Sequence, residues 1–208
     1  MDLRLKEGSK KGYFGKISGA TDFQNFYEGE FLANRFKNDF KLSVFALGTN
    51  TPRSNFGFSD TKKFGLSNES NFGGRWWENN NNFNSQSGIP KTFRSGFYFS
   101  DKLSKKVKLG VNYTYSNNEL NSISNQSSQY FLTDTTYYTS DLGNDTSKNE
   151  KHSVNFKLNI KLDSLTELEI KPRYTNSSGL STQNDSTRFI NEEGDLSSYT
   201  RNFNLNSG

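Results

Sequence analysis

The sequence predicts an all-β fold, an antiparallel meander of about eight strands. Three observations predict it. Aromatic residues make up 15% of the chain although hydrophobic residues make up only 30%. Apolar and polar residues alternate strictly in several segments. Short and long connections follow one another between those segments, and the residues most common in the chain disfavour helix interiors.

The composition separates this chain from both a soluble globular domain and a disordered segment. Globular domains carry roughly 45–50% apolar residues, glycine included, whereas the mean hydropathy here is −0.89. Disordered segments are poor in aromatic residues, but this chain has 19 Phe and 10 Tyr. A membrane barrel combines a polar lumen, an apolar outer band and aromatic girdles. The composition therefore favours a barrel in a membrane.

Period-two alternation identifies the strands, because successive side chains of a strand point to opposite faces. It is clearest in residues 107–115, where the odd-numbered residues are apolar or aromatic and the even-numbered ones are polar or glycine. Residues 152–162 and 165–176 repeat the pattern. The predicted strands are about 11–19, 25–36, 39–48, 91–101, 105–116, 151–162, 165–176 and 197–206.

The lengths of the connections indicate which kind of β-protein this is. Short turns are expected near 37–39, 101–105 and 163–164, and long loops at about 49–90, 117–149 and 178–196. Only the first link, near 20–25, departs from this alternation. Outer-membrane barrels have short periplasmic turns and longer extracellular loops, and their strands cross the bilayer with about 9–11 residues. We therefore expect a transmembrane β-barrel with the three long loops outside the cell.

Several functional classes are disfavoured. The net charge is +4, but the basic clusters, such as Lys105, Lys106 and Lys108, are too small to indicate a nucleic-acid surface. The absence of Cys excludes disulfides, thiolate metal sites and cysteine nucleophiles. The residues after Met1 contain no apolar signal-peptide core. No stretch approaches the 18 or more apolar residues of a membrane helix.

Candidate catalytic residues are scarce. His152 is the single His, and its place at a strand edge favours an interfacial aromatic role. No Ser–His–Asp set, zinc spacing or P-loop occurs, and residues 141–150 lack the EF-hand spacing. We therefore expect no enzyme activity, no cofactor and no metal. The charged residues expected to face a lumen are Arg94, Lys108, Lys157, Glu169, Lys171 and Arg173.

Trp76 and Trp77 are the candidate ligand-binding residues. They are adjacent in the first long loop, after a Phe-Gly-Gly-Arg stretch. Two indole rings can stack on a sugar ring or another flat ligand. The same pair can also anchor the chain at a membrane interface or pack within the loop, and the residues alone leave this choice open.

Three segments resemble one family. Residues 2–19 (DLRLKEGSKKGYFGKISG) resemble the junction between plug and barrel in TonB-dependent receptors. Residues 3–8 are similar to the end of the plug, and residues 10–19 to the linker and first barrel strand. Residues 130–138 (YFLTDTTYY) and 162–174 (LDSLTELEIKPRY) resemble stretches of the Bacteroidetes-type outer-membrane barrel family.

The resemblance implies a domain organisation and a function. Residues 1–10 would end the plug domain and its linker, and residues 11–208 would be the N-terminal portion of an outer-membrane barrel. Family barrels have about 22 strands, so this chain is expected to be a fragment, an open curved sheet with bare edges. The implied function is solute uptake across the outer membrane. The implied partners are the lipid bilayer, the missing plug and strands, and TonB, with no nucleic acid.

Two other functions stay open at this point. A small complete outer-membrane barrel, structural or adhesive, requires pairing between residues 11–19 and 198–206. A soluble secreted β-protein that binds glycans through Trp76 and Trp77 requires a second sheet over the apolar strand faces, because such faces are not left open to water.

Overall fold

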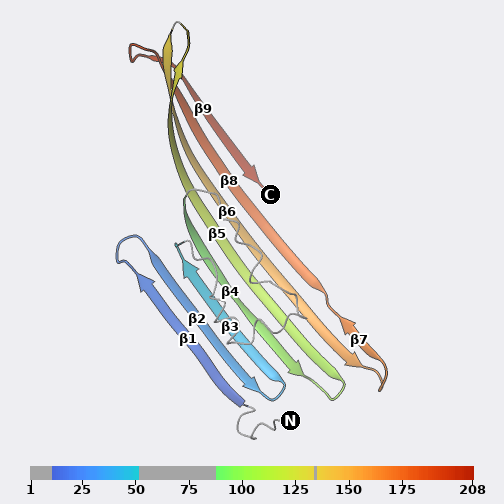
Figure 1. Cartoon of the computed structure of the whole chain (residues 1–208). Helices are drawn as coiled ribbons and strands as arrows, with labels where there is room; N and C mark the ends of the chain where they lie inside the picture. Colours follow the sequence, from blue (N-terminus) through green and yellow to red (C-terminus); the bar gives the residue numbers. More distant parts are fainter. Residues whose placement is uncertain (1–10, 52–87, 134) are drawn as a thin grey trace.

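The computed structural model describes residues 11–51, 88–133 and 135–208. These residues form one antiparallel sheet of nine strands in the order β1-β2-β3-β4-β5-β6-β8-β9, with β7 also paired to β6 (Figure 1). Neighbours in sequence are neighbours in the sheet, so the meander is confirmed. The sheet is open: β1 and β9 lie at the two ends of the strand order, and the pairing that a small complete barrel requires is absent from the described sheet.

The first four strands agree with the sequence analysis. They are β1 (Lys11–Thr21), β2 (Tyr27–Lys37), β3 (Phe40–Thr49) and β4 (Ile89–Lys102). The β2–β3 turn contains two residues, Asn38 and Asp39, between the pair Lys37 and Phe40. Asn38 has a φ of 55°, the left-handed conformation that tight hairpin turns need and that Asn tolerates better than most residues.

The next two strands are far longer than expected. β5 (Val107–Phe131) has 25 residues and β6 (Thr136–Lys161) has 26. Their register is unbroken from the pair Val107–Ile160 to the pair Phe131–Thr136. The expectation of a loop over residues 117–149 is therefore wrong. These residues are mostly polar on both faces, with scattered apolar residues such as Leu120, Ile123 and Leu142, so they show no hydrophobic period. The backbone ladder continues nevertheless, because it needs no apolar side chain.

The last three strands are β7 (Glu167–Ile170), β8 (Arg173–Ile190) and β9 (Leu196–Ser207). The pairs Leu158–Ile170 and Asn155–Arg173 keep one register along β6, so β7 and β8 are one strand interrupted at Pro172. Proline lacks an N–H for the ladder, although its carbonyl still accepts from the Phe156 N–H at 3.0 Å. The loop expected over 178–196 is also wrong, because only residues 191–195 form a turn.

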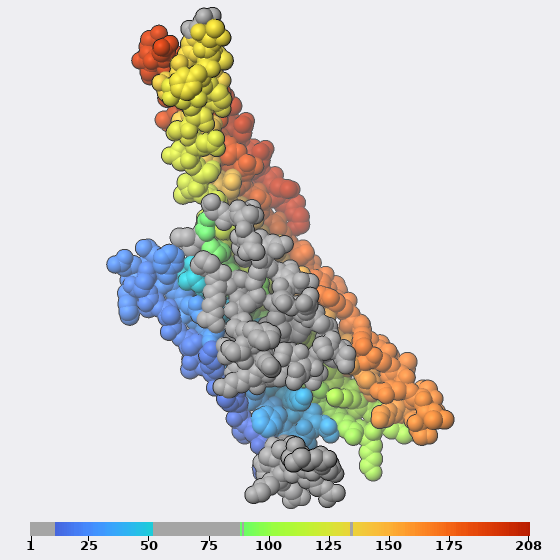
Figure 2. Space-filling model, in the orientation of Figure 1, coloured from blue at the N-terminus to red at the C-terminus, as the bar shows by residue number. Residues whose placement is uncertain are grey.

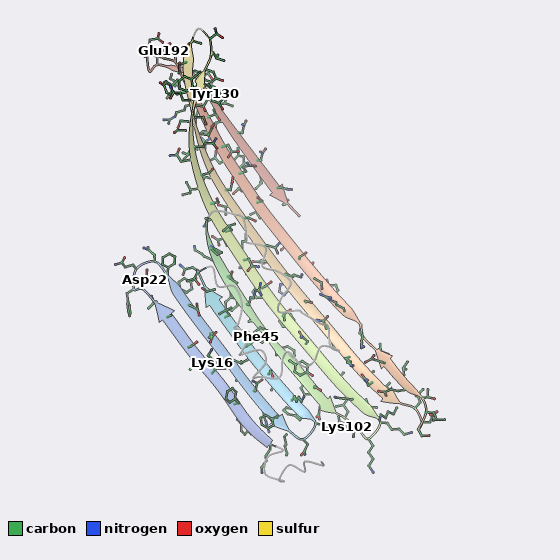
Figure 3. All side chains as sticks on the ribbon, viewed as in Figure 1. Lys16, Asp22, Phe45, Lys102, Tyr130 and Glu192 are labelled. Carbon is green, nitrogen blue, oxygen red and sulfur yellow. The ribbon has the colours of Figure 1, made fainter. Side chains whose placement is uncertain are left out.

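The two ends of the sheet differ. Since each strand reverses direction, the turns at 38–39, 103–106 and 162–166 all lie at one end, where Lys102 is labelled in Figure 3. The 22–26 turn and the end of β3 at Thr49 lie at the opposite end. At that end the sheet becomes narrower. β4 begins at Ile89, which pairs with Asn121, and four strands extend beyond this pair: β5, β6, β8 and β9. We call residues 122–131, 136–145, 183–190 and 196–204 the projection; it stands clear of the other described strands (Figure 2).

No helix in the described part of the chain is long and apolar enough to cross a membrane.

Candidate functional site

The sheet has two chemically different faces, because side chains alternate along every strand. One face, which we call the polar face, holds the buried side chains of the described strands, and the buried Asn50 follows β3. Cross-strand pairs place them together: Leu32 opposite Phe45, and Asn112 opposite Tyr98. The buried set on this face is Glu30, Leu32, Ser43, Phe45, Leu47, Thr49, Thr92, Tyr98, Ser100, Asn112, Leu120, Thr139 and Ser153.

Charged residues of the polar face form ion pairs. Lys16 on β1 pairs with Glu30 on β2. Glu169 on β7 bridges two lysines, with Nζ–Oε distances of 2.8 Å to Lys157 and 2.6 Å to Lys171. The strand register places five of the charged residues expected to face a lumen on this face: Arg94, Lys108, Lys157, Glu169 and Arg173. The sixth, Lys171, lies between β7 and β8 and reaches the same face through its ion pair with Glu169.

The opposite face, which we call the apolar face, carries large hydrophobic side chains that stay exposed. Phe97 on β4 is 37% exposed, Phe156 on β6 is 44%, and Ile17 on β1 is 83%. The described residues form one sheet, so no second sheet among them covers this face. Its apolar residues include Phe31, Val44, Phe97, Phe99, Val107, Leu109, Val111, Val154, Phe156, Leu158, Leu168 and Ile170.

The apolar residues form a band of limited height. On β5 it extends from Val107 to Tyr115, and on β6 from His152 to Ile160. About nine residues at roughly 3.3 Å each, tilted by about 40°, make a band roughly 23 Å tall. Beyond Tyr115 the same face becomes polar, with Asn117 and then Glu119.

An aromatic row marks the boundary of the band on the side of the projection. The Phe93 and Tyr115 rings lie 6.2 Å apart, and the Tyr115 and His152 rings 4.9 Å apart. The Tyr113 hydroxyl is 3.0 Å from His152 Nδ1. The hydroxyl and the imidazole nitrogen therefore form a hydrogen bond with each other at the edge of the apolar surface. The single His of the sequence therefore lies in this aromatic row.

Ion pairs follow directly beyond the aromatic row, still on the apolar face. Lys91 and Glu119 are 3.9 Å apart, and Lys148 and Glu150 are 3.2 Å apart. At the other end of the band lie the charged residues of the short turns, including Lys102 and Lys106. The band is thus bounded by charge at both ends.

Two turns are fixed by aspartate side chains. Asp22 Oδ1 accepts hydrogen bonds from the N–H groups of Gln24, Asn25 and Phe26. Bonds from the backbone, that of Phe26 first, hold the pKa of Asp22 below its ordinary value of 3.8.

Asp163 has the same role at the opposite end of the sheet, with Oδ1 accepting from the N–H groups of Leu165 at 2.7 Å and Thr166 at 2.8 Å. These bonds, that of Leu165 first, also lower the pKa of Asp163.

Trp76 and Trp77 lie outside the residues that the structure describes. Residues 141–150 belong to β6, and no group of three His, Cys, Asp or Glu in the described ranges could hold a metal ion. One feature was missed by the sequence analysis: a hollow of about 410 Å³ lined by Arg188, Ile190, Gly194, Leu196 and Tyr199. Its residues fall in the segment expected to be a loop and in the strand after it. The spacing of two between Arg188 and Ile190 could have indicated a strand with both side chains on one face.

No protein-family model, no curated protein and no solved structure matches this chain. The class that the geometry defines is an open, two-faced antiparallel sheet with an exposed apolar band.

Proposed function

We propose that this chain is a section of a transmembrane outer-membrane β-barrel, and that the barrel belongs to a TonB-dependent receptor that takes up a solute. The observation that carries the membrane part is the exposed apolar band, closed by an aromatic row and backed by a polar face. Outer-membrane barrels have an outward apolar band about 25 Å tall with aromatic girdles and a polar interior. Nine residues at about 3.3 Å each, in strands tilted by about 40° as in barrels, give the band here a height of roughly 23 Å.

The energetics favour lipid as the environment of the band. Soluble monomers rarely expose contiguous apolar patches of more than a few hundred Å², and this band extends over strands β1 to β8. Removing a Val, Leu, Ile or Phe side chain from water contributes about 1.5–3 kcal/mol. With side chains such as Val111 and Phe156 in the bilayer, the exposed band becomes a source of stability.

Backbone pairing supports the same conclusion. Unpaired N–H and C=O groups cost several kcal/mol each in hydrocarbon, so membrane sheets must pair every strand on both sides. Strands β2 to β5 are paired on both sides through the band. Within the described sheet, two edges in the band lack a neighbour: β1, and the edge of β7 with β8 up to Ser178. Further strands of the same barrel would pair with these edges.

The receptor part of the proposal depends on the resemblance of residues 2–19, 130–138 and 162–174 to TonB-dependent receptors. In that family the plug fills the barrel lumen, and TonB relays energy that displaces it. The polar face, with its Lys157–Glu169–Lys171 ion pairs, would then line the lumen. The chain would bind and guide a solute without covalent chemistry.

Paired single-cysteine variants test the membrane assignment, and the absence of native Cys makes the labelling clean. We would replace Val111 and Phe156 on the apolar face, and their neighbours Asn112 and Asn155 on the polar face, and attach a bimane fluorophore in lipid vesicles. Nitroxide-labelled lipids should quench the fluorophore strongly at Val111→Cys and Phe156→Cys and weakly at the other two. Equal quenching on the two faces, or a chain that stays in the aqueous phase, would refute the assignment.

The receptor assignment needs a separate test in the cell that makes this chain. Deletion of the gene should abolish the energy-dependent uptake of one solute, and loss of TonB should have the same effect. Uptake that persists without TonB would leave a barrel in the membrane but remove it from this receptor class.

A further inference from the structure

The far end of the projection carries apolar and aromatic side chains that its surroundings do not explain. The end of β5 and the turn at 191–195 lie together there, as the positions of Tyr130 and Glu192 show (Figure 3). Most other side chains of the projection on this face are polar, such as Asn144, Asn184 and Ser186. No described element covers this end, which stands clear of the rest of the sheet (Figure 2). A ligand from outside the chain is one way to cover such a surface.

A hollow lies on the apolar face at this end. Its volume is about 410 Å³, and Arg188 and Ile190 on β8, Gly194 in the turn, and Leu196 and Tyr199 on β9 line it. Arg188 lies directly opposite Tyr199 in the strand register. Small-molecule sites have volumes of about 300–1,000 Å³ and combine an apolar lining with a few placed polar groups. The hollow meets both conditions.

Tyr138 adds a second aromatic ring beside the hollow. It is the direct partner of Ile190 on the neighbouring strand β6, on the same face. Gln129 Nε2 donates to the Tyr138 hydroxyl at 3.1 Å, which restrains the ring. Strands lie about 4.8 Å apart, so Tyr138 and Tyr199 stand roughly 10 Å apart across the sheet, with the aliphatic side chains between them.

We infer that this hollow binds a neutral saccharide. A pyranose ring has an apolar C–H face that packs on a tyrosine ring and a rim of hydroxyls that needs planar hydrogen-bond groups. The Arg188 side chain makes no hydrogen bond or ion pair with the part of the chain that the structure describes, so the five N–H donors of its guanidinium are open to those hydroxyls. The aromatic rings, the aliphatic floor and the guanidinium match the two sides of a sugar.

The charge around the hollow selects a neutral sugar over an acidic one. The adjoining turn holds three carboxylates, Glu192, Glu193 and Asp195, against the single guanidinium of Arg188. A polyanion would be repelled by this turn, because like charges within a Debye length of about 8 Å interact unfavourably. The inference concerns the projection alone and does not depend on the membrane assignment, which is tested at the band.

Binding is measured on the full chain in detergent by saturation-transfer NMR with four neutral hexasaccharides: maltohexaose, cellohexaose, mannohexaose and chitohexaose. An oligogalacturonate of similar length is the acidic comparison. We expect one or more neutral sugars to bind at millimolar or lower concentration, and Tyr199→Ala and Arg188→Ala each to weaken binding about tenfold or more. Arg188→Lys should restore only part of the affinity, because an ammonium lacks the planar fork.

Two control variants separate a built site from general loss of structure. Tyr130→Ala removes a ring at the same end but on the polar face, where Tyr130 stacks on Tyr137 at 4.7 Å. Arg201→Ala removes the arginine of β9, whose Nε donates to Asn184 Oδ1. Both should bind like the parent chain, and all variants should keep its β-sheet circular dichroism. Absence of binding by every neutral sugar, preference for the oligogalacturonate, or binding that survives Tyr199→Ala and Arg188→Ala would each overturn the inference.

Discussion

The β5–β6 hairpin passes through two regions that share one backbone ladder and differ only in their side chains. From Val107 to Tyr115 one face is apolar, whereas from Ser122 to Gln129 both faces consist mainly of Asn, Ser and Gln. The register does not change between the two regions. Strand pairing is therefore independent of the apolar pattern, and that pattern records what each part of the strand faces: lipid, in our proposal, for the band and water for the projection.

The largest expected effect comes from a charge placed in the band. Val111→Lys puts an ammonium in the middle of the apolar run of β5. A Lys at the bilayer midplane destabilises an outer-membrane barrel by about 2–4 kcal/mol. We expect a loss of that size in the free energy of unfolding, measured by urea titration of the full chain in lipid vesicles.

The matched control is Asn144→Lys, on the same face of β6 but in the projection. A surface substitution there should change the free energy of unfolding by less than about 0.5 kcal/mol. An equal loss in the free energy of unfolding for Val111→Lys and Asn144→Lys would contradict the proposal that the band faces lipid and the projection faces water.

A second contrast uses two buried glycines. A Cβ at Gly96 in the band would meet the backbone oxygen of Tyr113 and the ring of Phe45, whose Cζ is 2.7 Å away. A Cβ at Gly143 in the projection would meet Ser124 Oγ at 2.5 Å and Asp185 Oδ1 at 3.1 Å, both on side chains that can rotate. Gly96→Ala should therefore cost about 1–3 kcal/mol, the usual range for overpacking.

Gly143→Ala should cost less than Gly96→Ala, because rotation of two polar side chains relieves the contact. Both free energies come from the same urea titration. A larger loss at Gly143 would mean that the projection is packed more rigidly than the band.

A third, smaller contrast concerns ion pairs. Glu169 bridges Lys157 and Lys171 on the polar face of the band, and the Lys157 side chain is only 21% exposed. Glu150 makes one pair with Lys148 outside the band, between side chains 36% and 45% exposed. Exposed ion pairs contribute little each, so Glu169→Gln, which removes two pairs, should lower the free energy of unfolding by more than Glu150→Gln, which removes one.

Salt gives the check on this contrast. At 1 M salt the Debye length falls to about 3 Å, so the cost of Glu169→Gln, measured as a free energy of unfolding, should shrink towards that of Glu150→Gln. A cost that does not change with salt would point to packing in place of charge.

The parts of the fold that the sequence predicted are those where side chains differ between the two faces. Residues 107–115, with Val, Leu and Tyr opposite Lys, Asn and Thr, identify their strand and both faces. Residues 117–131 continue the same strand but are mostly polar on both sides and show no regular alternation, and alternation is the main strand signal that a single sequence carries. Their Asn and Ser residues also favour turns, so a loop was the natural expectation.

The candidate site follows the same logic. The charged residues on the polar face were predictable because they follow or precede apolar residues in the sequence, as Lys157 lies between Phe156 and Leu158. The hollow was not, because Arg188 and Tyr199 come together only through pairing across the 191–195 turn. That register depends on backbone hydrogen bonds that the side chains of β9 do not specify.

The smallest expected effect is that of pH on the two aspartate-fixed turns, which lie at opposite ends of the sheet. Hydrogen bonds from the backbone lower the pKa of Asp163 in the folded chain below its ordinary value of 3.8. A lowered folded pKa contributes stability above the unfolded pKa, and that stability is lost as the pH falls through the folded pKa. The free energy of unfolding should therefore decline below about pH 4, and Asp163→Asn should flatten part of that decline.

Asp22 provides the comparison for this test, since its pKa is lowered by the same kind of bond. Asp22→Asn should flatten the decline by a similar amount, because both carboxylates are fully exposed and depend on local backbone N–H groups. Asparagine keeps an oxygen that can accept those bonds, so both variants should remain close to the parent at pH 7. The contrary result is a variant that changes the free energy of unfolding at pH 7 and leaves its decline below about pH 4 unchanged. That result would show that the turn depends on the shape of the side chain and that the charge of the carboxylate contributes nothing.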